Sequence, residues 1–94
     1  MTLPAGIQLR APGGSDAEAV LVLMLLTACQ VADTGRSDRE LADVMEQWGQ
    51  EGVDLARDAW LARDAGGDAV GYAFVHERRG EVWVHPRARG RGLG

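Results

Sequence analysis

The sequence contains no lysine and only one cysteine among its 94 residues. Because Cys29 has no second cysteine to pair with, an intrachain disulfide and a cysteine-based zinc site are both excluded, and we expect no metal. A P-loop needs a lysine against the nucleotide phosphates, so the absence of lysine also excludes that motif. Every full positive charge is therefore carried by arginine.

Positive charge is also missing ahead of the longest apolar run, residues 19–29, whose end resembles a lipoprotein cleavage motif. A secretion signal carries positive charge before its apolar part, whereas Asp16 and Glu18 precede this run. The run is also too short to span a bilayer as a helix. We therefore expect a cytoplasmic protein that does not associate with a membrane.

The overall composition is that of a globular protein, with 46% hydrophobic and 26% charged residues. Ninety-four residues suffice for one domain at the small end of the usual range. No internal repeat, low-complexity segment or linker divides them. We predict a single domain over residues 1–94.

Charge is distributed unevenly along the chain, although the net charge is only −4. Residues 1–77 carry five arginines and thirteen acidic residues, whereas residues 78–94 carry five arginines and Glu81 alone. An acidic body with a basic C-terminal segment indicates that this segment meets an anion. The acidic net charge and the strand pattern within the segment argue against a nucleic acid as that anion.

The first half predicts one short strand and a long helix. Ile7 and Leu9 alternate with polar residues before Pro12, which is typical of a short strand. Ser15 and Glu18 form a capping box, so a helix should begin at about residue 16 and continue to about residue 32. Because this helix is apolar on nearly all sides, we expect it to be buried on more than one side.

A second, amphipathic helix is predicted after a turn at residues 33–36. Ser37 and Glu40 form a second capping box, and the helix should end near Gly49. The following residues, 49–58, are polar and acidic and are expected to be a connector. The buried stripe of the helix consists of four residues at helical spacing: Leu41, Val44, Met45 and Trp48.

The second half changes to the period of β-structure. Residues 59–64 and 69–77 flank the turn sequence AGGD and predict a β-hairpin, and residues 81–84 predict a third strand after the turn ERRG. Val70, Tyr72 and Phe74 alternate, so we expect one face of their strand to carry all three, packed against a helix. The predicted fold is α+β with a mainly antiparallel sheet, in the order β-α-α-β-β-β.

Glycine and arginine alternate in the final loop, residues 89–94. Glycines let the backbone turn sharply and direct several N–H groups at one ligand, and arginines add forked donors suited to phosphate. A helix following such a loop would add a partial positive charge. The loop is suited to binding a pyrophosphate.

At this point the sequence resembles the GCN5-related N-acetyltransferases. Arg89, Gly92 and Gly94 match the family signature Arg/Gln-x-x-Gly-x-Gly/Ala, and VWVHP at 82–86 is similar to the end of the family's fourth strand. The element order is also that of the family. The resemblance implies an acyl-CoA N-acyltransferase-like fold of the three-layer α/β type, of which this chain represents the N-terminal part, with the C-terminal half absent.

The resemblance implies transfer of an acetyl group from acetyl-CoA to a primary amine, on either a small molecule or a peptide. It implies that the backbone of Val82, Trp83 and Val84 pairs with the pantetheine arm of the cofactor. It also implies that the final loop holds the pyrophosphate through the N–H groups of Arg89, Gly90, Arg91, Gly92, Leu93 and Gly94.

Two carboxylates are candidates for the acceptor side of the site. The resemblance suggests Glu81 as the base that deprotonates the amine, although a solvated edge carboxylate is the simpler interpretation. Asp33, between the two helices, is the candidate for binding the cationic amine, with a polar helix-ending turn as the alternative. Trp83 is expected to be a core aromatic rather than a pocket wall, and His76 and His85 are expected to be structural.

A non-enzymatic role is the alternative hypothesis. As a truncated or split half, the chain would leave an open sheet edge beside Val82 and Val84, which favours association. This interpretation predicts a homodimer or completion by another polypeptide. For the isolated chain we expect negligible turnover.

Overall fold

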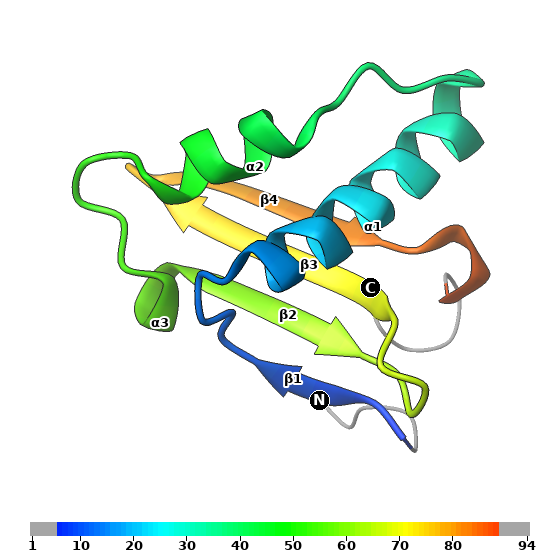
Figure 1. Cartoon of the computed structure of the whole chain (residues 1–94), viewed down its shortest axis with the longest axis horizontal. Coiled ribbons are helices and arrows are strands. Elements are labelled where there is room, and N and C mark those ends of the chain that lie inside the picture. The colour runs from blue at the N-terminus through cyan, green and yellow to red at the C-terminus, as the bar shows by residue number, and fades with distance from the viewer. Residues whose placement is uncertain (1–5, 89–94) are drawn as a thin grey trace.

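The computed structural model describes residues 6–88, and an antiparallel sheet with the strand order β1-β2-β3-β4 forms one layer of the molecule (Figure 1). Three helices and one 3-10 turn complete the fold. The strands are β1 Gln8–Arg10, β2 Ala59–Arg63, β3 Ala69–His76 and β4 Arg79–Val84; the helices are α1 Asp16–Thr34, α2 Leu41–Trp48 and α3 Leu55–Asp58, with η1 at Pro86–Ala88. The predicted α+β class, antiparallel sheet and element order are confirmed, with α3 added.

The beginning of α1 is fixed by the predicted capping box. The Glu18 backbone N–H donates to Ser15 Oγ at 3.2 Å, and the Glu18 carboxylate accepts from both Ser15 Oγ and the Gly13 backbone N–H. The helix ends at Gly35, whose φ of 86° is the left-handed conformation that glycine adopts without a steric penalty. Its N–H donates to the Val31 carbonyl, closing the last turn.

Only one face of α1 is buried, so the prediction of burial on more than one side was wrong. The opposite face remains exposed because no described element packs against it: Met24 is 61% exposed, and Val20 and Val31 are also exposed. By length and composition α1 could cross a membrane, but its buried stripe makes it the core helix of this fold. The stripe consists of Ala19, Val22, Leu25, Leu26 and Cys29.

The start of α2 is capped differently from the prediction. The Glu40 backbone N–H donates to the Asp43 carboxylate at 2.8 Å, so the capping box joins residues 40 and 43. The hydroxyl of Ser37 instead donates to the Gln30 side chain at 2.6 Å, across the turn between the helices. Ser37 Oγ also accepts from the Arg39 backbone N–H at 3.3 Å, so it closes the turn before α2 instead of capping the helix.

The predicted connector contains the short helix α3. Asp54 caps it by accepting from the Ala56 N–H, and Asp58 at its end accepts from the Arg57 side chain at 2.8 Å. The hydrogen bond from Arg57, followed by that from the Asp54 N–H, lowers the pKa of Asp58 to about 2. This carboxylate is largely buried where the connector joins β2.

Two hairpins build the sheet, and each departs slightly from the sequence prediction. The β3–β4 turn is the two residues Glu77 and Arg78, both with positive φ, so β4 begins earlier than predicted. A register shift between β2 and β3 near Ala62 inserts one extra residue on β3. This bulge places Val70 against Ala62 and away from the cluster that holds Tyr72 and Phe74, so the expected shared face of the three was wrong.

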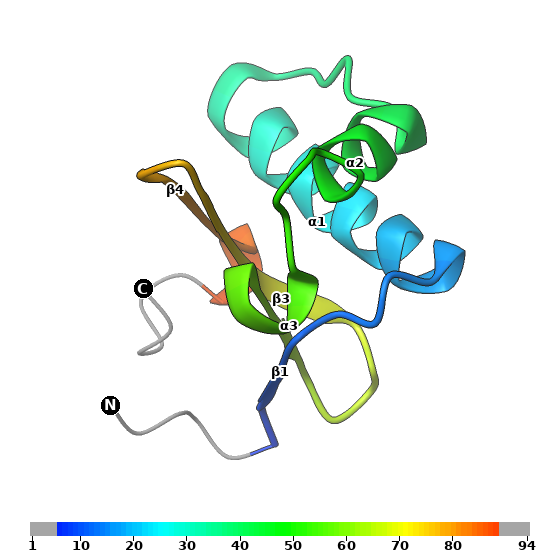
Figure 2. The ribbon, with the colours of Figure 1, turned by 90° about the vertical axis from the view of Figure 1, so that its left-hand side faces the viewer.

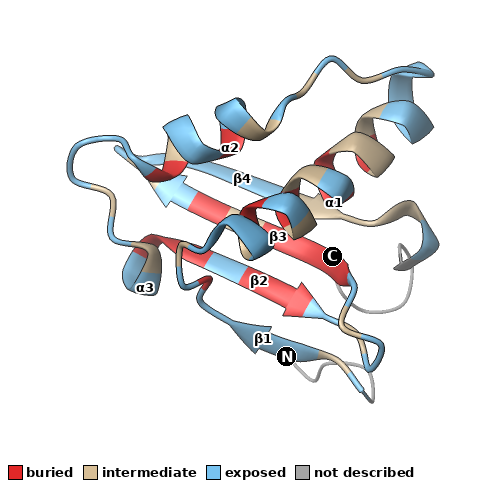
Figure 3. Ribbon diagram, viewed as in Figure 1, coloured by how far each residue is buried: buried red, intermediate tan, exposed pale blue. Residues whose placement is uncertain are grey.

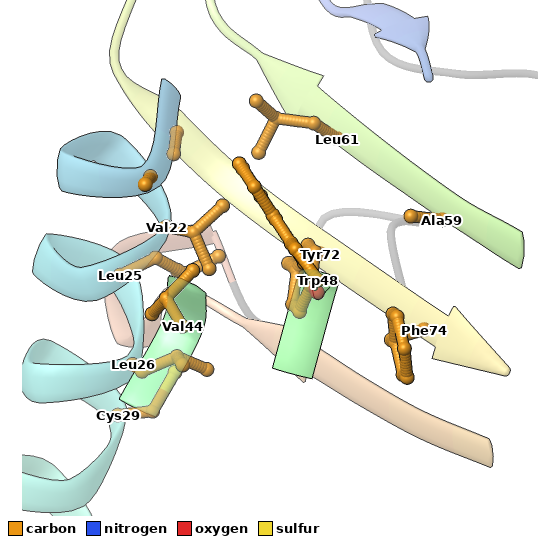
Figure 4. Close-up of a cluster of buried hydrophobic side chains, with 12 residues drawn as sticks. Val22, Leu25, Leu26, Cys29, Val44, Trp48, Ala59, Leu61, Tyr72 and Phe74 are labelled. Carbon is orange, nitrogen blue, oxygen red and sulfur yellow. Dashed lines mark hydrogen bonds between the residues drawn. The ribbon is translucent and has the colours of Figure 1, made fainter. Parts of the chain in front are cut away.

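The main core lies between the sheet and the two long helices, which cover the same face (Figures 2 and 3). Leu25 and Leu26 from α1, Val44 from α2 and Leu61 from β2 are all at most 2% exposed. Figure 4 shows that Tyr72 lies in the middle of this cluster, beside Trp48. The opposite face of the sheet is not covered by any helix of the described chain.

Candidate active site

The backbone of β4 is the first part of the candidate site, because β4 is an outer strand of the sheet. The two-residue turn makes His76 and Arg79 a hydrogen-bonded pair, and the His85 N–H donates to the Val70 carbonyl at 2.8 Å. In antiparallel pairing, hydrogen-bonded pairs alternate with non-hydrogen-bonded pairs, so the residues at odd positions of β4 point their backbone groups at β3. Val82 therefore directs its backbone N–H and C=O away from the sheet.

Trp83 is oriented the opposite way. Its backbone faces Tyr72 on β3, and its side chain packs half-buried against the main core on the helix-covered face. The Arg39 guanidinium lies 5.0 Å from the centroid of its ring, which is a cation–π contact. Trp83 Nε1 is buried, and no described residue accepts its hydrogen bond. The expectation of a core aromatic fits this placement.

Glu81 lies two residues earlier, on the same face of β4 as Trp83. Its carboxylate Oε2 accepts a hydrogen bond from Gln47 Nε2 of α2 at 3.3 Å. Glu81 and Gln47 line a hollow of about 500 Å³ whose floor is Phe74. His76, Glu77, Arg79 and Gln50 complete its wall. The hollow is open to solvent and contains groups of both charges.

A buried hydrogen-bond network lies directly behind this hollow. Trp48 Nε1 donates to the hydroxyl of Tyr72 at 3.0 Å, and Tyr72 donates to Gln47 Oε1 at 2.9 Å. Burial raises the pKa of Tyr72 to about 12; the bond from Trp48 acts in the opposite direction, and the charge of Glu81 adds to the rise.

The sequence analysis did not single out Gln47. Its partners lie 25 and 34 residues away along the chain, and no local pattern indicates such contacts. The only available signal was general: a buried tyrosine or tryptophan needs a partner for its polar atom.

Asp33 lies in the last turn of α1, exposed and away from Glu81. This end of α1 is held at the end of β4, where Cys29 Sγ donates to the Val84 carbonyl at 3.2 Å. Glu81 is three residues back along β4, a separation of roughly 10 Å. The two candidate carboxylates therefore lie toward different ends of the strand, and no described hydrogen bond joins them.

The expected pyrophosphate loop, Arg89 to Gly94, lies outside the described residues. The segment leading to it is anchored: Arg87 pairs with Asp64 at 3.4 Å and Asp68 at 3.9 Å, in the β2–β3 turn. The Arg87 N–H also donates to His85 Nδ1 at 3.1 Å. Within residues 6–88, no group of three or more ligating side chains could hold a metal ion.

Comparisons with known proteins bear on the fold rather than on the geometry of the site. No family model and no curated protein matches the chain. Among solved structures, it is similar to a GCN5-related N-acetyltransferase from Sphaerobacter thermophilus, with 40% sequence identity and a TM-score of 0.87. The match covers 99% of this chain and 30% of that chain. The resemblance inferred from the sequence is confirmed along nearly all of the 94 residues.

Proposed function

Because the chain has the fold of part of a GCN5-related N-acetyltransferase, we propose that it takes part in the transfer of an acetyl group from acetyl-CoA to a primary amine. The observation that carries this proposal is the match at 40% identity over 99% of the chain. The chain spans 30% of the related protein, so activity, acceptor and partners are all part of the proposal. We expect the protein to act in the cytoplasm.

The outer edge of β4 supports a role in cofactor binding. Val82 presents one backbone donor and one acceptor away from β3, the arrangement that an extended amide-containing chain such as pantetheine can pair with. We assign Val82 and Val84 to the pantetheine side of the site and residues 89–94 to the pyrophosphate. The Trp83 backbone faces β3, so we assign Trp83 no backbone bond to pantetheine, which departs from what the resemblance implies. Acetyl-CoA would supply the activated acetyl thioester.

The acceptor amine needs to lose a proton before it can attack a carbonyl carbon. Glu81 is our candidate for the group that takes this proton, because its carboxylate borders a solvent-filled hollow beside the β4 edge. Asp33, near the far end of β4, is the candidate for attracting the cationic amine. A backbone N–H preorganised at the developing negative charge would stabilise the transition state.

Tryptophan fluorescence during a titration with coenzyme A tests the cofactor assignment. Trp83 lies in the proposed cofactor strand, so binding should quench its emission saturably, and acetyl-CoA but not free phosphate should compete. Trp60, 39% exposed on the uncovered face of the sheet, gives the matched control. Quenching should persist in Trp60→Phe and disappear in Trp83→Phe. No quenching in the unmodified chain would contradict the proposal.

A second function, association through the open sheet, is favoured by one specific observation. Val82 on the outer strand is 73% exposed, and Val75 and Trp60 on the same uncovered face are 43% and 39% exposed. An apolar edge of this kind tends to pair with another chain. Size-exclusion chromatography tests it: a dimer or hetero-complex supports this function, and a monomer at all concentrations contradicts it.

A further inference from the structure

Three consecutive hydrogen bonds connect the core of the molecule to the candidate base. They run from Trp48 Nε1 to Tyr72 Oη at 3.0 Å, from Tyr72 Oη to Gln47 Oε1 at 2.9 Å, and from Gln47 Nε2 to Glu81 Oε2 at 3.3 Å. Four residues from α2, β3 and β4 thus form one continuous chain. Its inner end is buried, and its outer end opens into the hollow beside β4.

The direction of each bond in this chain is fixed by chemistry at both ends. An indole N–H can only donate, and an ionised carboxylate can only accept. Tyr72 must therefore accept from Trp48 and donate to Gln47, and Gln47 must present its carbonyl to Tyr72 and its NH₂ to Glu81. Reversing the Gln47 amide would place its carbonyl oxygen against the Glu81 carboxylate and leave the Tyr72 hydroxyl hydrogen without its acceptor, so only one arrangement satisfies every group.

Bonds aligned in one direction polarise one another, and a satisfied buried network holds its members in place. Trp48 and Tyr72 are 8% and 2% exposed, so the inner part of the chain has little freedom to move. Gln47 transmits that rigidity to Glu81 at the border of the hollow. Within residues 6–88 the chain engages only Oε2 of Glu81.

From this geometry we propose that Gln47 is a positioning residue that orients the Glu81 carboxylate toward the acceptor amine. The inference rests on the proposed function in one respect only, namely that Glu81 takes the proton of the amine. With Oε2 held by Gln47, the second carboxylate oxygen is presented to the hollow. Tyr72 and Trp48 act through Gln47 and do not contact the substrate.

Nuclear magnetic resonance of the tryptophan indole groups tests the coupling without any need for activity. When the pH is lowered from about 7 to about 3, carboxylates become protonated. In the unmodified 94-residue chain, the chemical shifts of the Trp48 indole N–H and of the Gln47 side-chain amide should change with pH along the same titration curve. That curve should be lost in Glu81→Gln, because the terminal charge no longer changes.

The decisive comparison is between Gln47→Met and Gln50→Met. Gln50 lines the same hollow, but no described residue bonds to its side chain, so its replacement should leave the Trp48 curve unchanged. Gln47→Met should abolish the curve. The indole signals of Trp60 and Trp83 report in the same spectra whether each variant is folded. A Trp48 curve that persists in Gln47→Met, or that is absent from the unmodified chain, would overturn the proposal.

Kinetics separate this proposal from the proposed function. When another polypeptide or a second copy completes the fold, Gln47→Met should lower kcat for acetyl transfer by about ten- to a hundredfold and leave the KM for acetyl-CoA unchanged, because a displaced base slows the reaction without weakening cofactor binding. Gln50→Met should change neither. An equal loss of kcat in both variants would count against positioning. Failure of the unmodified chain to bind coenzyme A would refute the proposed function, while the resonance experiment would still decide the coupling.

Discussion

The two faces of the sheet are made by the same strands but have opposite environments. On the helix-covered face, Leu61 and Phe74 are 2% and 5% exposed; on the other face, Trp60 and Val82 are 39% and 73% exposed. Figure 2 shows both long helices on one side of the sheet. From this difference we expect stability to come mainly from the covered face. The uncovered face and the β4 edge are available for binding.

The largest expected effect compares two neighbouring residues of α1. Leu25 is 1% exposed within the core, and Met24 is 61% exposed on the outer face. Leu25→Ala should lower the free energy of unfolding by about 2–5 kcal/mol, because it leaves a cavity. Met24→Ala should change it by less than about 0.5 kcal/mol. Urea denaturation of both variants measures this; equal losses would contradict the one-sided burial of α1.

The next effect is a pH dependence that arises from the covered face. The pKa of Tyr72 is 10.0 ordinarily and about 12 in the folded protein, so the folded state holds this proton more tightly. The resulting stabilisation is complete below pH 10 and is lost as the pH rises toward 12. Two pKa units correspond to about 2.8 kcal/mol, and solvent screening reduces the stabilisation below that value.

Denaturation measured across the alkaline range checks this expectation. Tyr72 is the only tyrosine, so the tyrosinate absorbance reports it alone. Tyr72→Phe should remove this part of the pH dependence, and Glu81→Gln should shift the tyrosine titration to lower pH because a nearby negative charge is gone. A titration near pH 10 in the folded protein would contradict the buried position of the hydroxyl.

A smaller effect is expected from the contact that ties the segment between α1 and α2 to β4. Arg39 stacks on Trp83, and its replacement by alanine should cost about 0.5–1 kcal/mol and alter the Trp83 emission. Arg36 lies in the same segment and is exposed. Arg36→Ala is therefore the matched control, and both its stability and its fluorescence should be unchanged. Equal effects of the two replacements would argue against a specific stacking contact.

The smallest effect is predicted at the uncovered edge. Val82→Thr keeps the branched side chain at a position that is 73% exposed, so stability should change by less than about 0.5 kcal/mol. Affinity for coenzyme A should also be unchanged, because our proposal assigns binding to the Val82 backbone. A large loss of affinity in this variant would show that the side chain, rather than the main chain, makes the contact.

Much of the fold could be predicted because its signals are local. Ser15 with Glu18 fixed the start of α1, and the glycine-containing sequence after β2 indicated the hairpin. The errors arose where a distant contact or a single inserted residue decided the outcome. Ser37 bonds to Gln30 rather than capping α2, and the bulge removes Val70 from the alternation expected for β3.

The candidate site was less predictable than the fold. The strand containing Glu81 and Val82 was predicted from the turn before it, but which of its backbone groups face outward depends on the length of that turn. The contact between Gln47 and Glu81 joins residues 34 positions apart, so it arises only when α2 packs over β4. All of the site assignments stay predictions: Glu81, Asp33, Val82, Trp83, Val84 and residues 89–94.

The most direct test of coenzyme A binding at the β4 edge is to record backbone amide signals while coenzyme A is added to the 94-residue chain. We expect the signal of the Val82 N–H, which faces away from the sheet, to shift, and its proton to exchange more slowly with solvent. The Trp83 N–H faces β3, so it should be much less affected and serves as the internal comparison. Saturable changes confined to the β4 edge would support the cofactor assignment. Changes on the uncovered face without Val82, or no changes at all, would contradict it.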